Sequence, residues 1–213
     1  MVANLASWLS DAWTDYQNGW AAADRELYDL CVRRGHDSFI DVYTKVAFIN
    51  RVYAAGISRS IPTAAGADGE TRVAQALVDS RVHVGASLTR LSGLDGINPD
   101  ALMTIVEEHA KLVDQLALHC GGVRPTSFAS KYLHFHCDLV PIFDSRVVEA
   151  IGKVMAPHIP RYQPTQQLLP RPPQYEPNYY WYVGRFLRLW ELAGEVTPTP
   201  TVKMLDHALW QRG

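Results

Sequence analysis

The chain has 213 residues, of which 47% are apolar, and 20 basic residues stand against 22 acidic ones for a net charge of −2. This length and composition exclude a disordered chain and suffice for one sizeable core, or for two small helical lobes that share an interface. The near-neutral charge provides no long-range field for nucleic acid or an anionic membrane. A polyanionic partner therefore has to be bound by a local patch.

The number of cysteines and the lengths of the apolar runs indicate the cellular compartment of the protein. Three cysteines, Cys31, Cys120 and Cys137, are a sparse and odd set that does not suggest a disulfide framework. No stretch approaches the roughly 18 apolar residues of a membrane span, and the N-terminal segment lacks the pattern of a signal peptide. We therefore expect a cytoplasmic protein that does not associate with membranes.

The first half of the chain shows helical periodicity. Apolar residues recur every three or four positions in residues 5–16 and 27–31, on either side of Gly19, and again in residues 41–55 before a stop at Gly56. Residues 63–69 are small and polar and predict a loop, and the helical pattern resumes in residues 70–82. The sequence thus predicts four helices before residue 83.

The next helix has the clearest sequence signals for its start and its end. Asn98 and Pro99 form an N-cap and first-turn pair, and an apolar stripe runs from Leu102 to Leu116. Gly121 and Gly122 supply the stop. The boundaries of this helix can be predicted from the sequence.

A proline-rich segment separates this region from the C-terminus. Seven prolines lie between Pro157 and Pro177, too many for a helix or a central strand, and predict an irregular connection. Residues 179–190 form one more amphipathic helix pattern, and residues 202–210 predict a short last helix. Of the four consecutive aromatic residues at 179–182, two are expected in the core, and the others are free to cover the proline-rich loop or to stack on bases.

The predicted fold class is all-α, a compact multi-helix protein without internal repeats. Its expected organisation is a single helical domain over residues 1–213. Within it, residues 1–118 carry the N-terminal helices, 119–156 the segment with most chemistry-bearing side chains, 157–177 the proline-rich loop and 178–213 the C-terminal helices.

The order of elements in residues 121–146 resembles a known superfamily. A helix ends in a glycine hairpin, a second helix opens with Thr126 and Ser127, and an apolar-Pro-apolar segment around Pro141 leads to Asp144 at the next helix start. This arrangement, over about 30 residues, resembles the helix-hairpin-helix DNA glycosylases, including the 8-oxoguanine and adenine-mismatch enzymes.

The resemblance implies a glycosylase-like helical fold and a DNA partner, a duplex with one nucleotide flipped out of the stack. In that superfamily the backbone amides of the hairpin hold a DNA phosphate, and the corresponding positions run from Gly122 to Pro125. The residues that we expect to contact DNA are Gly122, Val123, Arg124, Thr126, Ser127 and Arg146. The superfamily aspartate beside the sugar corresponds to Asp144. The iron-sulfur cluster of some relatives needs four cysteines, so we expect no cofactor in this chain of three.

The implied chemistry is the breaking of an N-glycosidic bond, which builds positive charge on the sugar. A nearby carboxylate stabilises that charge, and Asp144 can also orient or deprotonate the attacking water. Lyase-type glycosylases add a lysine that forms a Schiff base with the sugar. Lys131 is the one lysine of residues 121–146, so it is the candidate for that role.

Each of these residues has an alternative interpretation without chemistry. Asp144 followed by Ser145 is also the pattern of an ordinary N-cap. Lys131 also fits a solvated helix residue whose stem packs on neighbouring aromatic rings. Arg146 can pair with Asp144, meet a phosphate or simply be exposed.

Further candidates lie outside this core motif. Asn50 and Tyr53 at a helix end, with His134, are candidates for a base pocket; the alternative is a helix cap around a buried tyrosine. Two histidine- and cysteine-containing runs, residues 119–120 and 134–137, match no zinc spacing. We expect no metal site there and at least one of these histidines in the core.

The sequence thus supports one leading function and two alternatives. The leading hypothesis is a DNA glycosylase-like enzyme acting on a modified or mismatched base, with Asp144 central and Lys131 accessory. The runner-up is a non-catalytic module in which the same scaffold binds DNA or another protein. The third is a structural or interaction protein of helical lobes joined by the proline-rich loop. Oligomeric state and the identity of the base are not encoded in these patterns.

Overall fold

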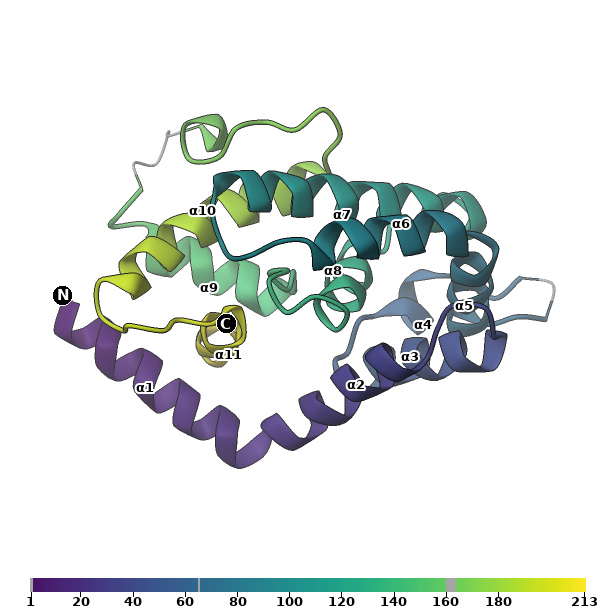
Figure 1. Ribbon diagram of the computed structural model, residues 1–213, viewed down its shortest axis with the longest axis horizontal. Helices are drawn as coiled ribbons and strands as arrows, with labels where there is room; N and C mark the ends of the chain where they lie inside the picture. The colour runs from purple at the N-terminus through teal and green to yellow at the C-terminus, as the bar shows by residue number, and fades with distance from the viewer. Residues whose placement is uncertain (1, 65, 160–163) are drawn as a thin grey trace.

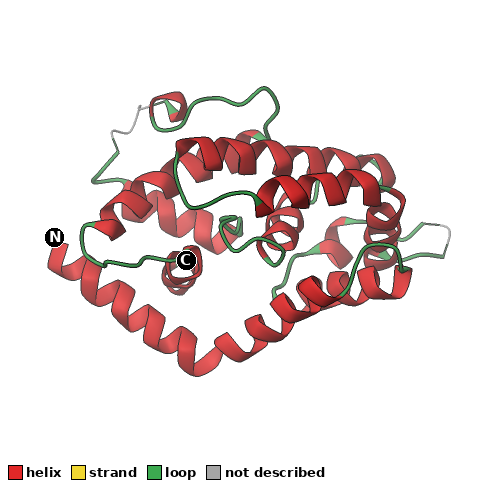
Figure 2. Ribbon diagram, in the orientation of Figure 1, coloured by secondary structure: helices red, strands yellow, loops and turns green. Residues whose placement is uncertain are grey.

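The computed structural model describes residues 2–64, 66–159 and 164–213, and all named elements in these ranges are helices (Figure 1; Figure 2). In chain order they are α1 (Val2–Gly19), α2 (Ala21–Arg33), α3 (Phe39–Val52), α4 (Ile57–Ser60), α5 (Gly69–Asp79), α6 (Arg81–Ser92), α7 (Pro99–His119), α8 (Thr126–His134), α9 (Ser145–Met155), the 3-10 turn η1 (Thr165–Gln167), α10 (Pro177–Gly194) and α11 (Val202–Arg212). The all-α prediction is confirmed. Within the same residues, no helix has the length and apolar character that a membrane span requires.

The two ends of the chain pack against each other. α1 lies against α11, α11 packs on α9, and α9 contacts α10. Figure 1 shows these four helices towards the left and α3 to α6 towards the right, with α8 between them and α7 running along the upper side from one group to the other. The buried apolar side chains form one cluster that includes residues from both ends, so a single continuous core supports the fold.

Local sequence determines where α7 begins and where it turns towards α8. The side chain of Asn98 accepts a hydrogen bond from the amide of Ala101 at 2.9 Å, and Pro99 occupies the first turn, as predicted for the start of α7. The helix ends where Gly121 and Gly122 adopt φ angles of 68° and 82°, a region that glycine enters without strain. The Arg72 guanidinium fixes this end by donating to the His119 carbonyl at 2.9 Å.

One predicted helix is two helices in the structure. The pattern in residues 70–82 predicts a single element, but the chain turns at Ser80 and continues as α6 to Ser92. Only Val84 and Leu91 of α6 are buried. A stripe of two residues two turns apart is too narrow to stand out as amphipathic periodicity, which is why α6 is absent from the prediction.

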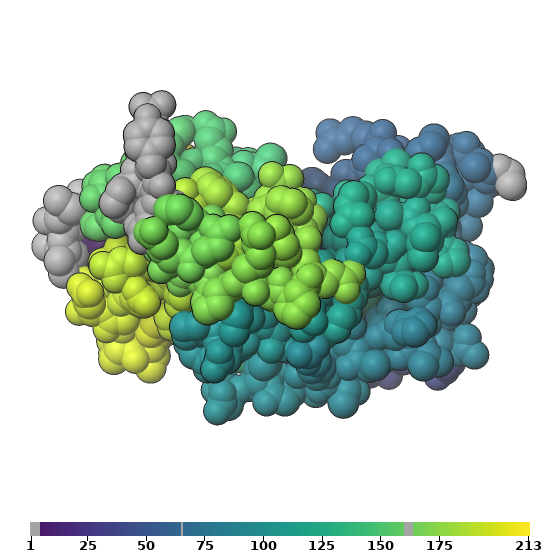
Figure 3. Space-filling view, turned by 90° about the horizontal axis from the view of Figure 1, so that it is seen from above, coloured from purple at the N-terminus to yellow at the C-terminus, as the bar shows by residue number. Residues whose placement is uncertain are grey.

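The proline-rich loop is irregular, as predicted, apart from the short turn η1; residues 160–163 of that prediction lie outside the described residues. Gln174 donates to the Asp114 carboxylate of α7 at 2.6 Å, and the Tyr180 hydroxyl donates to the Leu169 carbonyl at 2.7 Å. Figure 3 shows the segment lying over the surface beside α7. Three of the four aromatic residues at 179–182 are buried rather than two, because Tyr180 packs under this loop.

Two fully buried histidines stabilise the hairpin region as neutral imidazoles. His109 stacks on Tyr179 with ring centroids 3.8 Å apart, and its Nε2 donates to the Thr126 carbonyl at the start of α8. His134 donates from Nδ1 to the Val140 carbonyl, so its Nε2 accepts from the Tyr28 hydroxyl at 2.6 Å. Burial lowers the pKa of His109 to about 4 and that of His134 to about 3.

These shifts predict acid sensitivity. The unfolded chain binds protons at both imidazoles below a pKa of about 6.5, whereas the folded chain does not until the pH reaches the lowered pKa values. The free energy of unfolding should therefore fall as the pH drops below about 6.5, by up to about 1.4 kcal/mol per pH unit for each histidine. Urea unfolding at pH 7, 6 and 5 measures this slope.

The matched control is His158→Gln, because His158 is exposed. The slope should persist in that variant and shrink in His109→Gln. Equal stability of the wild-type protein at pH 7 and pH 5 would contradict the assignment of neutral buried imidazoles.

Candidate active site

A pocket with a volume of about 310 Å³ lies where α8 and the start of α9 face α11 and the junction of α1 and α2. Lys131 and Asp144, the two candidate catalytic residues, both line it, together with Tyr53 and Arg146. The structure therefore brings four of the predicted site residues to one cavity.

Lys131 is almost completely buried, with 4% of its side chain exposed. Its Nζ donates to the Asp144 Oδ2 at 2.8 Å and to the Tyr53 carbonyl at 2.7 Å. That carbonyl lies beyond the end of α3, next to Ala54, whose φ of 48° turns the chain away from the helix. The alternative interpretation of Lys131 as a solvated residue is therefore wrong, because its side chain is buried and both of its acceptors belong to the protein.

Asp144 is both a helix cap and a pocket residue. Its Oδ1 accepts from the Arg146 amide at 3.0 Å, which caps α9, while Oδ2 accepts from Lys131. Ser130, next to Lys131 on α8, accepts from the Phe143 amide at 2.9 Å. α8 therefore positions the lysine directly and the aspartate through the residue before it.

A second group of charges lines the same pocket. The Asp24 carboxylate of α2 accepts from the hydroxyls of Tyr16 and Tyr53 and from the Lys203 ammonium, which lies 2.8 Å away. Asp206, one turn further along α11, lies 3.7 Å from the same ammonium and is buried. Burial raises the pKa of Asp206 to about 6.

Aromatic rings form the remaining walls. Trp20 lies 5.9 Å from Trp210 and 6.1 Å from Tyr53, measured between ring centroids. The Arg146 guanidinium stacks over Trp210 at 4.4 Å, and Arg59 of α4 also lines the pocket and is exposed. A flat, uncharged group can stack on such walls, and an anion can meet the two guanidinium groups.

The hairpin uses part of its hydrogen-bonding capacity internally. The amides of Gly122, Val123 and Thr126 donate to backbone carbonyls of the hairpin and its flanking helix end. Arg124 pairs with Asp114 of α7 at 2.7 Å. Within the described residues the Ser127 amide has no intramolecular acceptor, so the start of α8 is the part of the hairpin still able to hold a phosphate.

Two predicted pocket residues lie elsewhere. Asn50 is buried against α5, where it donates to Glu70 at 2.8 Å and accepts from the Ile57 amide at 2.9 Å. His134 is completely buried and holds Tyr28 and the Val140 carbonyl. Both side chains shape the core, and neither lines the pocket. His134 confirms the expectation that a histidine of this run packs in the core.

No metal site is found among the described residues, since no three histidine, cysteine or acidic side chains gather there in a suitable arrangement. Cys31, Cys120 and Cys137 are free thiols.

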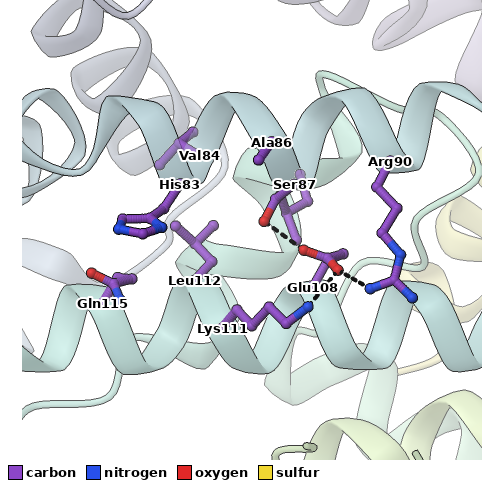
Figure 4. Close-up of a pocket in the computed structure, with 10 residues that line it drawn as sticks. His83, Val84, Ala86, Ser87, Arg90, Glu108, Lys111, Leu112 and Gln115 are labelled. Carbon is purple, nitrogen blue, oxygen red and sulfur yellow. Dashed lines mark hydrogen bonds and ion pairs between the residues drawn. The ribbon is translucent and has the colours of Figure 1, made fainter.

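Another pocket lies between α6 and α7, with a volume of about 350 Å³. Figure 4 shows its one carboxylate, Glu108, bonded by Ser87, Arg90 and Lys111, at distances of 2.5 to 2.9 Å. All of its charges are therefore engaged with one another. The pocket lined by Lys131 and Asp144 is the better candidate because a third carboxyl group in its lining, Asp206, keeps an oxygen without a hydrogen-bond partner among the described residues.

Sequence reasoning missed the contribution of the chain ends. Trp20 lies at the junction of α1 and α2, Asp24 on α2, and Lys203 and Asp206 on α11, and only the folded chain brings these segments to α8. The sequence contains one signal for two of these residues. Asp24 and Asp206 each fall on the buried stripe of their helix, where a charged side chain is unfavourable unless it has a specific role.

Comparison of the chain with protein-family models, curated proteins and solved structures found no match. The function of the pocket has to be inferred from its own residues.

The burial of the Lys131–Asp144 pair predicts strong coupling. Asp144→Asn keeps the cap, because asparagine caps as well as aspartate, but it leaves a buried ammonium without its counter-ion. The free energy of unfolding should fall by about 3 kcal/mol and recover largely when Lys131→Met is added. Urea unfolding of the two single variants and the double variant measures the coupling.

The exposed pair Lys153–Glu149 on α9 provides the matched control, since both side chains are more than half exposed. Its coupling should be below about 0.5 kcal/mol. Additive effects at Lys131 and Asp144 would mean that their contact contributes nothing to stability.

Proposed function

We propose that this chain is a DNA N-glycosylase, which hydrolyses the bond between deoxyribose and a modified or mismatched base flipped into the Lys131 pocket. The observation that carries the proposal is the Asp144 carboxylate, held 2.8 Å from the buried Lys131 ammonium, in a pocket walled by Trp20, Tyr53 and Trp210. The resemblance of residues 121–146 to helix-hairpin-helix glycosylases supports the same assignment.

The chemistry follows from charge. As the glycosidic bond lengthens, positive charge builds on the sugar, and a fixed carboxylate in a site of low dielectric stabilises it. Asp144 is oriented by its two hydrogen bonds, from the Arg146 amide and from Lys131, so it needs no reorganisation as the charge develops. The same carboxylate can accept a proton from the attacking water.

The contacts of Lys131 favour hydrolysis over a Schiff base. A nucleophilic lysine needs a free lone pair, but Nζ here donates to both Asp144 and the Tyr53 carbonyl. Lyase chemistry would require the lysine to leave both acceptors. Lys131 therefore acts in this proposal by positioning Asp144.

The surroundings of the pocket suit a flipped nucleotide. A volume of about 310 Å³ falls within the range of small-molecule sites, and its aromatic walls match the faces of a base. The exposed Arg59 and Arg146 at the pocket, with the free Ser127 amide, can contact the flanking phosphates. A local patch of this kind is what a chain with a net charge of −2 requires to bind DNA. A cytoplasmic location, with its three thiols reduced, is part of the proposal.

The test is base release from duplexes that carry a panel of damaged, mismatched and naturally modified bases. The wild-type protein should release at least one base, and Asp144→Asn should slow single-turnover release by about 10²-fold or more. Lys131→Gln should also slow release, and borohydride should trap no adduct. All assays run below the melting temperature measured for each variant.

The outcomes distinguish the alternatives. Release that is unchanged in Asp144→Asn would contradict the proposal, and a trapped adduct lost in Lys131→Gln would make the lysine a nucleophile. No release with salt-dependent DNA binding would favour a non-catalytic DNA module. No release and no such binding would favour a protein-interaction role.

A further inference from the structure

A second carboxyl group in the pocket is incompletely bonded. Asp206 lines the cavity and is 7% exposed, and its Oδ1 has no hydrogen-bond partner among the described residues. Its Oδ2 lies 3.7 Å from the Lys203 ammonium, beyond the range of a good hydrogen bond. A buried polar atom without a partner destabilises a fold, so its presence beside a cavity indicates a task performed there.

The neighbouring Asp24 differs from Asp206 in its hydrogen bonding. Both of its oxygens are engaged, one by Tyr53 and the other by Tyr16 and Lys203. Asp24 therefore has a structural role, because it holds Tyr16, Tyr53 and Lys203 together at the pocket. Asp206 retains an oxygen that a bound molecule can reach.

The electrostatic surroundings suit Asp206 to donate a proton. Burial raises the pKa of Asp206 to about 6, while the nearby ammonium groups of Lys203 and Lys131 oppose the rise. Part of the population is therefore a neutral carboxylic acid near neutral pH. A group of this kind is an efficient general acid, and Asp144, which is held by Lys131, provides the complementary carboxylate.

We propose that Asp206 is the general acid that protonates the departing base, and that the substrates are neutral bases rather than bases already cationic from alkylation. This inference rests on the proposed glycosylase function and adds a catalytic residue and a substrate class to it. A base that is already cationic from alkylation leaves without taking up a proton, so a general acid in the pocket assists the departure of neutral bases only.

The bond between C1′ and the base nitrogen breaks, and its electron pair leaves with the base. The Asp206 proton moves onto a ring nitrogen or carbonyl oxygen of the base. Water forms the new bond to C1′ and gives a proton to Asp144. Solvent then carries that proton back to Asp206, so both carboxyl groups regain their starting states.

Other titratable or charged groups face Asp206 from every element around it. They are Asp15 and Tyr16 of α1, Asp24 and Tyr28 of α2, Tyr53 after α3, Arg59 of α4, Lys131 of α8, Asp144 and Arg146 at the start of α9, Tyr182 of α10, and Lys203 and His207 of α11. Of these, the His207 imidazole, which lies 2.9 Å from the Asp15 carboxylate, is the one that needs a separate control variant.

The experiment measures single-turnover base release between pH 5 and 8 for a neutral base identified in the panel and for 7-methylguanine, whose base is cationic. For the neutral base, the wild-type rate should fall about tenfold per pH unit above about pH 6. Asp206→Asn should remove this limb and slow release at pH 6 by about 10²-fold. Release of 7-methylguanine should be weak or absent in the wild type and, where measurable, change by less than about threefold in Asp206→Asn.

Three controls accompany the variant. His207→Gln should keep the pH limb, and Glu149→Gln, an exposed carboxylate of α9, should match the wild type. The melting temperature of Asp206→Asn at pH 7 should be no lower than that of the wild type, because the substitution removes a buried ionisable group.

Several results would overturn the inference while leaving the glycosylase proposal intact. These are a wild-type rate and profile in Asp206→Asn, loss of the limb in His207→Gln instead, or equal loss of neutral and cationic base release in Asp206→Asn. A wild-type protein that releases no base from any duplex would overturn both proposals.

Discussion

The Lys131 ammonium is the contact on which the geometry of the pocket depends. Burying a charge is strongly unfavourable unless its hydrogen bonds are satisfied, and Lys131 satisfies two of its own with the Tyr53 carbonyl and the Asp144 carboxylate. These acceptors come from the end of α3 and the start of α9, whereas the lysine is on α8. A single side chain thus fixes the mutual position of three segments, the consecutive helices α8 and α9 and the end of α3, which lies 78 residues before Lys131. The pocket forms between them.

The carboxyl groups of the pocket differ in whether they stabilise the fold or remain available for catalysis. Asp24 and Lys203 neutralise each other and tie α2 to α11, as a structural ion pair does. Asp206 has no such compensation for its free oxygen, and Asp144 serves at once as helix cap and as pocket carboxylate. A chain selected for stability alone would replace Asp206 by an apolar residue. The hydrogen bonding of the carboxyl groups therefore distinguishes Asp24, which stabilises the fold, from Asp206, which is available for catalysis.

Local sequence patterns predicted much of the fold, because helices are set by periodicity and caps within a few residues. α7 begins at Asn98 and Pro99 and stops before two glycines, as expected, whereas α6 buries too narrow a stripe to be seen. Lys131 and Asp144 were identified from one motif, but their direct contact and the burial of the lysine could not be. Trp20, Asp24 and Asp206 join the pocket only because α1 and α2 meet α11, and such long-range packing leaves no local signature.

In the proposed mechanism the Asp144 carboxylate faces the sugar of a flipped nucleotide and stabilises its developing positive charge. The most direct measurement compares the affinity of the protein for two duplexes, one with a pyrrolidine abasic analogue, whose ring nitrogen is cationic, and one with neutral tetrahydrofuran. This comparison needs no knowledge of the base. The wild-type protein should bind the pyrrolidine duplex at least about tenfold more tightly, and Asp144→Asn should lose this preference. Equal affinities in the wild type, or a preference that persists in Asp144→Asn, would contradict this mechanism.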